Sequence, residues 1–426
     1  MSCRMLALGA AALLGVAACT DRSVVSPTAQ NPSQPAFNVT SVIDPAPAPW
    51  ARIVTGRTGP NSKYKLYIPA DWNGDAVFYA HGFRTPFDPI DFDDTQDSVV
   101  AVRTALGNLG YALAYSTFDE NGLVVKDGAD RTHQLRGLLA SELHGQPHRS
   151  YLLGFSLGGG IALNLAETYP KQYDGLLTVC GMVGGTPIET QYIGDVRALF
   201  DYFYPGVLPG DVTSVPWPPL SKDEVIARVM TAVGANPLGL FVIASTAQTP
   251  LAYEPVGDIT DPSSTAFQTL FTSLIYALYN QQLSTPGIEA QTHGHPPYGN
   301  RGVTYTLGTP VGPAPAPVLE ALIAQANANV GRYDISPDAS NYLAKYYTPT
   351  GVLPFPTVTV HALWDPFVPY FHETALAERV QAAGYSDMLV QRGVPVFTHC
   401  DLDASLVMSS FQDLVNWVTT GNKPAN

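Results

Sequence analysis

Short apolar segments alternate with helical segments over much of the chain from residue 64 onward. The apolar segments have the length and the aromatic or β-branched content of buried strands, and stretches such as 129–143 and 159–170 have the character of helices. Strands separated by helices of this length predict parallel pairing with right-handed crossovers. The predicted strands of this first part are 64–68, 76–80, 111–117, 150–154 and 175–179.

The alternation stops after residue 181 and resumes at about residue 351. The residues between contain many prolines and aromatic side chains and helical stretches at 222–233 and 266–280, but no clear buried strand. We therefore expect a mainly helical lid over 182–350, inserted between two parts of one core, 49–181 and 351–426. The second part is predicted to contain strands at 357–362 and 387–391 and helices at 373–383 and 406–419.

The first residues have the composition of a targeting segment. Arg4 precedes an apolar stretch that is too short to span a bilayer. The stretch ends in Val-Ala-Ala-Cys, which resembles the lipobox of bacterial lipoproteins, where cleavage precedes a cysteine that is then lipidated. An ordinary secretory signal cut near Ala18 is the alternative, and both predict export. We expect a signal peptide over 1–18 and a flexible tether over 19–48, with a lipid on Cys19 that anchors the protein to a membrane of the bacterial cell envelope.

The composition is that of a folded, acidic protein. Hydrophobic residues make up 46% of the 426 residues and charged residues 14%, so there is enough apolar surface for a large core. The formal net charge is −14 and no run of lysine and arginine is present, so phosphate backbones would be repelled. We expect no nucleic-acid partner. The expected substrate is a small molecule or a peptide, and the oligomeric state is not predicted.

The cysteines agree with export. Of the 4 cysteines, Cys3 would leave with the signal peptide and Cys19 would carry the lipid, so Cys180 and Cys400 remain in the folded part. An even pair in an oxidising compartment is a candidate disulfide, and two separate buried thiols are the alternative.

The pattern G-x-S-x-G at 154–158 lies between a predicted buried strand and a predicted helix. At such a turn the serine side chain is pushed outward, and glycine on both sides lets the backbone pass itself without a Cβ clash. The helix N-terminus offers N–H groups where an oxyanion would form. We therefore predict Ser156 as a nucleophile. The turn lacks the G-x-G-x-x-G spacing of dinucleotide sites, so no cofactor is expected.

A serine hydroxyl needs a base that removes its proton. His399 follows the last predicted strand, where the base of such a site belongs, and is the predicted base. His361 lies inside a strand and His372 at a helix start, and we interpret both as structural. His293 and His295 could chelate a metal, but no third ligand is in view, so we expect a solvated loop and no metal site.

The base in turn needs a carboxylate that orients it. Asp365 stands in the loop after the strand at which the core resumes, between the nucleophile and the base in chain order. The alternative is that Asp365 only starts a turn, because aspartate is favoured at that position before a proline such as Pro366. The alternative acids, Glu189 and Asp195, lie farther from the end of the preceding strand. We predict Asp365 as the acid.

Two backbone N–H groups are expected to bind the oxyanion of the tetrahedral intermediate. The turn His81-Gly82-Phe83 directly follows a buried strand, as the oxyanion loop of such enzymes does. We predict that the N–H groups of Phe83 and Leu157 form the oxyanion hole.

The HGF turn (81–83), the GFSLGG elbow (154–159), the DPFVP loop (365–369) and the THC loop (398–400) resemble, in kind and in order, the motifs of the α/β-hydrolase family. The resemblance covers both core parts but neither the tether nor the insertion. It implies an α/β fold with a mostly parallel sheet flanked by helices, and a serine hydrolase activity. From residue 347 onward the chain also resembles exported bacterial hydrolases of the prolyl-oligopeptidase or serine-aminopeptidase branch, which implies no particular substrate.

The cysteines depart from one subfamily of this family. Tannases and feruloyl esterases pair a cysteine beside the serine with one beside the histidine, whereas Phe155 precedes Ser156 here. Cys400 therefore has no partner at the elbow, which argues against that subfamily. Cys180 ends the strand next to the one that leads to the predicted acid, at the edge of the sheet where the histidine loop should lie. We predict a disulfide between Cys180 and Cys400 that holds this loop.

Together these residues predict acyl transfer through a covalent serine intermediate, with an ester as the expected substrate. A peptidase or amidase with the same triad is an alternative, and a non-catalytic lipoprotein binding module on a hydrolase scaffold is another. Aromatic residues early in the insertion are expected to pack the core of the lid or to line an acyl pocket. They are Tyr192, Phe200, Tyr202, Phe203, Tyr204 and Trp217.

Overall fold

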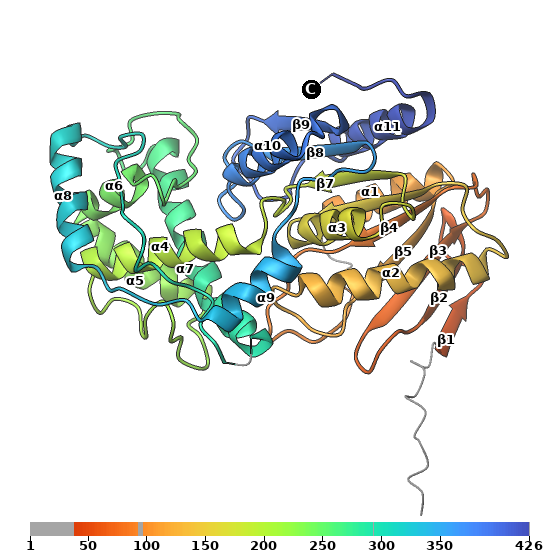
Figure 1. Cartoon of the computed structure of the whole chain (residues 1–426), viewed down its shortest axis with the longest axis horizontal. Coiled ribbons are helices and arrows are strands. Elements are labelled where there is room, and N and C mark those ends of the chain that lie inside the picture. The colour runs from red at the N-terminus through yellow and green to blue at the C-terminus, as the bar shows by residue number, and fades with distance from the viewer. Residues whose placement is uncertain (1–37, 93–96, 293, 426) are drawn as a thin grey trace, which may run out of the picture. The chain divides into compact units, whose positions relative to one another are not determined.

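The computed structural model describes residues 38–92, 97–292 and 294–425. The predicted signal peptide, Cys19, the tether up to residue 37 and His293 lie outside these residues. Within them, one sheet has the strand order β1-β2-β3-β5-β4-β6-β7-β8-β9 (Figure 1). The strands are β1 (Asn38–Ile43), β2 (Trp50–Arg57), β3 (Lys63–Pro69), β4 (Ala76–Ala80), β5 (Ala112–Ser116), β6 (Ser150–Phe155), β7 (Gly175–Val179), β8 (Thr357–Ala362) and β9 (Leu389–Val394).

The strands from β5 to β9 in the sheet order run parallel to one another, and β3 pairs antiparallel with β5. The central parallel strands are short and apolar because both of their faces are covered. In β4 every residue is buried: Phe78 packs into the core on one face of the sheet, and Val77 and Tyr79 pack into the core on the other.

Helices cover both faces of this sheet (Figure 1). α1 (Asp97–Asn108) and α11 (Ala404–Thr420) share one hydrophobic core with the sheet. α2 (Val125–Glu142), α3 (Leu157–Thr168) and α10 (Phe371–Ala383) share the core on the opposite face. This strand order, with helical crossovers on both sides, is that of the α/β-hydrolase fold, so the predicted fold class is confirmed.

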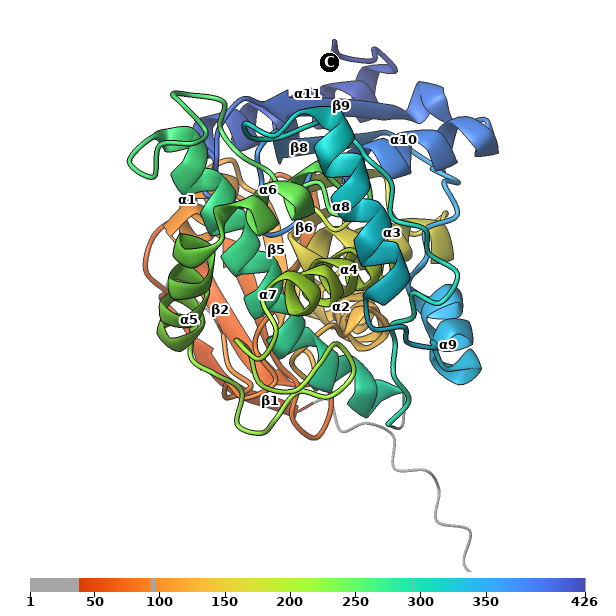
Figure 2. The ribbon, with the colours of Figure 1, turned by 90° about the vertical axis from the view of Figure 1, so that its left-hand side faces the viewer.

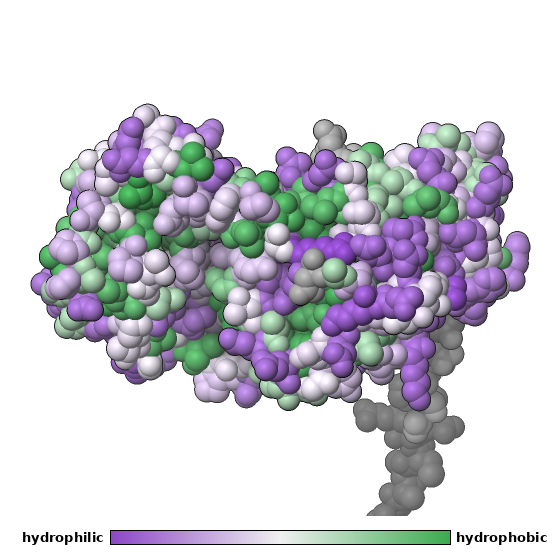
Figure 3. Space-filling view, turned by 90° about the horizontal axis from the view of Figure 1, so that it is seen from above, coloured by the Kyte–Doolittle hydropathy of each residue, from purple (hydrophilic) through white to green (hydrophobic). Residues whose placement is uncertain are grey.

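The stretch between β7 and β8, for which a lid is predicted, is helical (Figure 2). It has a hydrophobic core of its own. On the face drawn in Figure 3, hydrophobic residues gather where this insertion meets the α/β part, and much of the α/β surface beyond them is hydrophilic. The helices are α4 (Thr186–Phe203), α5 (Lys222–Ala235), α6 (Pro237–Ser245), α7 (Thr265–Gln291), α8 (Ala316–Asn329) and α9 (Pro337–Tyr347).

The sheet begins earlier than predicted. The tether predicted over 19–48 is wrong for 38–43, because these residues form β1 and pair antiparallel with β2. β1 is an edge strand whose Val42 and Ile43 are 48% and 47% exposed, so it lacks the alternation of buried apolar positions by which a strand is recognised. The sequence pattern also does not predict β2 or α1.

Several other elements differ from their predicted bounds, and α7 and β9 show two physical reasons for this. α7 continues to Gln291, through Pro286, where the predicted helix ends at 280; the burial of Leu283 and Ile288 keeps this last part packed. β9 begins at Leu389 because the three residues before it form a short 3-10 helix, η1 (Ser386–Met388).

Among the described residues, no single helix has both the length and the apolar composition needed to cross a membrane. α5 and α6 meet those two criteria only as a pair, and they are bent by 100° relative to each other.

Candidate active site

Ser156 lies at the sharp turn between β6 and α3. Its φ of 54° is in the left-handed region, which is strained for a residue with a side chain. A Cβ at Gly154 would overlap the carbonyl oxygen of Gly158, and a Cβ at Gly158 would overlap that of Ala80. Only glycine fits at either position, which is the backbone geometry expected of a nucleophile elbow.

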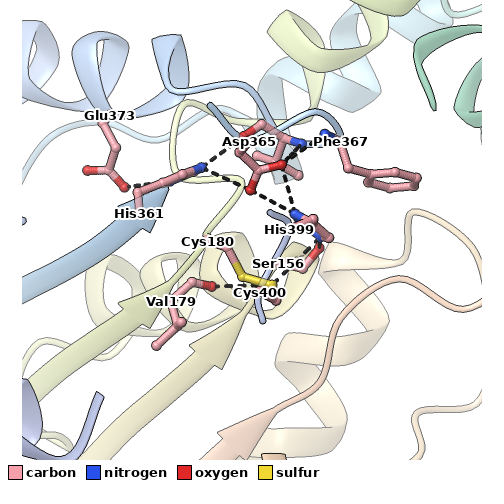
Figure 4. Close-up of a disulfide and its surroundings, with 10 residues drawn as sticks. Ser156, Val179, Cys180, His361, Asp365, Phe367, Glu373, His399 and Cys400 are labelled. Atoms are coloured by element: carbon pink, nitrogen blue, oxygen red, sulfur yellow. Dashed lines mark hydrogen bonds and ion pairs between the residues drawn. A yellow bond between two sulfur atoms is a disulfide. The ribbon is translucent and has the colours of Figure 1, made fainter. Parts of the chain in front are cut away.

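His399 and Asp365 lie beside Ser156 although the three are far apart in the chain (Figure 4). The Ser156 hydroxyl donates to Nε2 of His399 at 2.9 Å, and Nδ1 of His399 donates to Oδ2 of Asp365 at 2.8 Å. Asp365 follows β8 and His399 follows β9, so the carboxyl ends of parallel strands bring them to one edge of the sheet. The structure thus brings the predicted nucleophile, base and acid together in the predicted order.

The Asp365 carboxylate is fully buried and accepts several hydrogen bonds. Its Oδ1 accepts hydrogen bonds from the backbone N–H groups of Phe367 at 2.8 Å and Val368 at 2.9 Å. Burial alone would raise the pKa of Asp365, but the charge and hydrogen bond of His399 and the hydrogen bond of His361 hold that pKa below its usual range. Asp365 is therefore ionised at neutral pH and can orient the imidazole.

The backbones that carry the predicted oxyanion donors flank Ser156. Leu157 is the first residue of α3, where a backbone N–H has no partner within its helix. A Cβ at Gly82 would lie only 3.1 Å from the Cβ of Ser156, so the turn that carries Phe83 passes directly beside the serine. That Phe83 and Leu157 donate to an oxyanion stays a prediction.

A disulfide joins Cys180 and Cys400, as predicted, with a Cα–Cα distance of 5.3 Å. Cys180 directly follows β7 and Cys400 directly follows His399, so the bond ties the histidine loop to the end of a central strand. Phe155, where tannases and feruloyl esterases have a cysteine, is buried in the core shared by α1 and α11.

In the described part of the chain, one cluster of possible ligand atoms has the spacing needed to hold a metal ion. It consists of Cys180, Cys400 and His399, whose ligand atoms lie within 4.8 Å of one another. The two sulfurs are bonded to each other, and both nitrogens of His399 are engaged by Asp365 and Ser156. The ligand atoms of this cluster are therefore already engaged in the disulfide and in the hydrogen bonds of His399.

The alternative acids have other partners. Glu189, on α4, is fully buried and accepts hydrogen bonds from Nε2 of His372 at 3.0 Å and from Asn280 at 2.9 Å. Burial, together with the nearby charge of Asp365, raises the pKa of Glu189 to about 8. Asp195 accepts hydrogen bonds from two tyrosine hydroxyls inside the insertion. Neither carboxyl is bonded to His399.

The sequence interpretation missed His361 as a neighbour of the site. His361 is fully buried, and its Nε2 lies 3.4 Å from Oδ2 of Asp365 (Figure 4). The available signal was an ionisable side chain on β8, four residues before the predicted acid, in a strand whose other residues are Thr, Val and Ala. His295, in contrast, lies 3.5 Å from Asp338, away from the site residues.

An aromatic wall leads from His399 to the insertion. The ring of Phe367 lies 5.1 Å from the imidazole of His399, and the ring of Tyr276, on α7, lies 5.6 Å from that of Phe367. The ammonium of Lys222, at the start of α5, is 4.4 Å from the Tyr276 ring and donates to its hydroxyl at 3.1 Å. Phe367, Tyr276 and Lys222 are all partly exposed.

The aromatic residues singled out early in the insertion serve mainly its own core. Tyr192, Phe200 and Tyr204 are buried there, and Tyr202 and Phe203 pack against them. Trp217 differs, because it is 68% exposed and its ring lies 4.2 Å from that of Phe87, which follows the HGF turn.

No family model matches the chain. Over 178 residues it is 28% identical to a protein named probable feruloyl esterase B-2 of Aspergillus flavus, and the match covers 39% of this chain and 32% of that protein. The match thus spans about a third of the relative's length.

Two solved structures illustrate the wider likeness. Feruloyl esterase B from Aspergillus oryzae is 15% identical with a TM-score of 0.44, and the match covers 91% of this chain and 88% of that one. Candida antarctica lipase A is 14% identical with a TM-score of 0.40, and the match covers 88% and 78%. Both TM-scores are below 0.5, so the fold assignment rests on the strand order.

Proposed function

We propose that this chain is an exported serine hydrolase that cleaves carboxylic esters through an acyl-enzyme on Ser156. The observation that carries the proposal is the continuous line of hydrogen bonds from Ser156 Oγ through His399 to the buried Asp365 carboxylate. The likeness to a protein named probable feruloyl esterase B-2 supports an ester as the substrate.

The reaction proceeds in two halves. His399 Nε2 takes the proton from the Ser156 hydroxyl as Oγ attacks the ester carbonyl carbon, and the N–H groups of Phe83 and Leu157 bind the resulting oxyanion. The bond to the alcohol breaks as His399 returns the proton to the leaving oxygen. Water then repeats the sequence on the acyl-enzyme, which releases the acid and restores the serine. Asp365 holds the imidazolium that forms in each half.

We place the acyl or alcohol group of the substrate against the aromatic wall of Phe367 and Tyr276. Both rings are partly exposed, Phe367 stands beside His399 and Tyr276 stands beside Phe367, so a planar group bound there would stack while its ester carbonyl reaches Ser156. The proposal therefore favours esters that carry an aromatic or other planar group.

Export is part of the proposal. The targeting pattern of the first residues and the Cys180–Cys400 disulfide both support an oxidising compartment. Lipidation of Cys19 and attachment to the bacterial envelope stay predictions from the sequence.

Hydrolysis rates with p-nitrophenyl esters and aminoacyl p-nitroanilides test this function. We expect turnover of the esters to exceed that of the anilides, and Ser156→Ala to lower kcat by about 10⁴- to 10⁶-fold with an unchanged unfolding temperature. Faster turnover of the anilides would assign a peptidase or amidase instead. Full ester turnover by Ser156→Ala would contradict the mechanism.

A further inference from the structure

His361 is buried at the end of β8 with both ring nitrogens bonded (Figure 4). Its Nε2 lies 2.8 Å from the carbonyl oxygen of Val368, and its Nδ1 lies 3.1 Å from Oε1 of Glu373 on α10. The side chain has no exposed surface. Burial of a polar ring is costly unless its nitrogens are hydrogen-bonded, and here both nitrogens face an acceptor.

The partners of His361 determine its protons. A carbonyl oxygen cannot donate, so Nε2 must carry a hydrogen toward Val368. The other oxygen of Glu373, Oε2, accepts hydrogen bonds from the hydroxyl of Thr359 at 2.6 Å and from the side-chain amide of Gln391. Two donors on Oε2 favour an ionised Glu373 carboxylate, and with that carboxylate ionised, Nδ1 of His361 carries the hydrogen toward Oε1. The ring then holds two hydrogens and a positive charge.

The His361 ring is connected to the proposed acid, Asp365, both directly and through the backbone of Val368. Nε2 of His361 lies 3.4 Å from Oδ2 of Asp365, the same oxygen that accepts from His399. Val368 also links the two residues, because its carbonyl accepts from His361 while its N–H donates to Oδ1 of Asp365. His361 thus contacts both the Asp365 carboxylate and the backbone of the loop that donates to it.

Among the other ionisable groups near this pair, His372 and Glu189 are buried, whereas Tyr370, whose ring lies 5.8 Å from that of His361, is partly exposed. His372, on α10, donates from Nε2 to Glu189, on α4, and its Nδ1 accepts from the N–H of Gly184, so its ring is neutral. Burial lowers the pKa of His372 to about 3, in agreement with this assignment. Burial alone would lower the pKa of His361 as well, but the hydrogen bonds and charges of Asp365 and Glu373 raise it to about 10. His361 is therefore the positive charge next to Asp365 that does not depend on the catalytic cycle.

We propose that His361, held as an imidazolium by Glu373, is a positioning residue that fixes the Asp365 carboxylate toward His399 and balances part of its charge. The proposal rests on the function proposed above, since it assigns a role in the proton transfers of His399. Without the balancing charge, Asp365 would hold the proton on His399 more tightly, and the free base needed by Ser156 would form only at higher pH.

The pH dependence of kcat/KM with a nitrophenyl ester tests this role in the mature protein. His361→Gln keeps a donor toward Val368 but removes the charge, and Glu373→Gln removes the carboxylate that holds the second proton. In both variants we expect the acid limb of the profile to move to higher pH, by about one unit for His361→Gln. The change in Glu373→Gln should be smaller, because a negative charge is lost together with the positive one.

His372→Gln is the matched control. It replaces a histidine that is equally buried but neutral, so it should lower the unfolding temperature without moving the acid limb. If His361→Gln also lowers only the unfolding temperature and keeps the wild-type acid limb, His361 is a purely structural residue and the proposal is wrong.

A second readout does not depend on activity or on a folded variant. The ring ¹⁵N resonances of His361 in the wild-type protein should be those of an imidazolium at pH 8; resonances of a neutral ring would overturn the proposal. If the wild type hydrolyses no ester and Ser156 proves unreactive, the proposed function fails, and an imidazolium signal from His361 would then describe structure alone, so the positioning role would fall with it.

Discussion

The three side chains proposed to carry the reaction differ in how much water reaches them. Asp365 is fully buried, the residue Ser156 is 6% exposed, and the side chain of His399 is 23% exposed. The buried carboxylate keeps its charge and position because its donors replace the lost water. The more accessible imidazole can pass protons between Ser156, the leaving alcohol and the incoming water.

The position of His399 also depends on the disulfide beside it. We expect the double variant Cys180→Ser with Cys400→Ser to lose about 2–5 kcal/mol of unfolding free energy, as removal of a native disulfide typically does. Its kcat should fall as well, because the histidine loop is no longer tied to the end of β7. Thermal unfolding and ester turnover, each with and without a reductant, measure both effects.

The reductant supplies the control for this experiment. It should lower the unfolding temperature of the wild type and leave that of the double variant unchanged. Equal unfolding temperatures for the wild type in both buffers would show that the disulfide contributes nothing to stability.

At the residue scale, side chains with a motif or a fixed place after a strand were predictable, and those defined by packing were not. Ser156 lies in a G-x-S-x-G turn, and Asp365 and His399 stand in loops where the chain order of such enzymes places them. His361 carries no such mark, because a histidine inside an apolar strand does not reveal which acceptors face it. Only the fold brings Glu373 and Val368 to its two nitrogens.

At the scale of elements, the insertion contributes to the site through α7 and α5. The side chains of Tyr276 and Lys222 extend the wall that begins with Phe367, whereas most aromatic residues of α4 pack inside the insertion. The insertion therefore supplies surface near His399, and the α/β part carries the three side chains proposed to react.

Tyr276→Ala tests whether the insertion supplies binding surface for the substrate. We expect it to raise KM for p-nitrophenyl benzoate about three- to tenfold while the KM for p-nitrophenyl acetate changes little, because only the larger acyl group can stack on the wall. The shared leaving group isolates the acyl contribution. Tyr279→Ala, one turn along the same helix and packed against the core of the insertion, is the matched control. Equal changes for both substrates would remove Tyr276 from the binding surface.

Elements with a strong apolar pattern were predicted closely, and those that depend on their surroundings were not. The bounds predicted for β4, β7 and β8 agree with the structure, since these strands are buried on both faces. β1 is held by backbone pairing with β2, and such pairing does not require a pattern of apolar side chains that could be recognised in the sequence. α7 continues past Pro286 because tertiary packing outweighs the local preference to end there.

At the scale of the whole molecule, stability should fall on the alkaline side of neutrality. The pKa of Glu189 is raised from 4.5 to about 8, so the stability linked to this group is complete below about 4.5 and is lost as the pH rises through about 8. The pKa of His361 is raised from 6.5 to about 10, so its contribution is complete below about 6.5 and is lost as the pH rises through about 10. Both groups act in the same direction between about pH 6.5 and pH 8, and of the two His361 alone continues to act up to about pH 10.

Unfolding temperatures measured from pH 5 to pH 10 test this linkage. Glu189→Gln removes one of the two groups at nearly constant size, so its unfolding temperature should fall less steeply than that of the wild type between about pH 5 and pH 8. Parallel curves for the two proteins would show that Glu189 does not titrate in the folded state as described.

The architecture as a whole was predictable because it depends on the alternation of strand and helix along the chain. That alternation defines a parallel sheet with crossovers, and its interruption marks the insertion. The packing of α4 to α9 was not predictable, because helices of similar composition can be arranged around a core in several ways. The distance between the insertion and the base is a property of that packing.

The reactivity of Ser156 tests the central claim most directly. A fluorophosphonate probe should label the wild-type protein at neutral pH, mass spectrometry should place the adduct on Ser156, and the label should disappear in Ser156→Ala. An unlabelled wild type, or an adduct on another residue, would contradict the account.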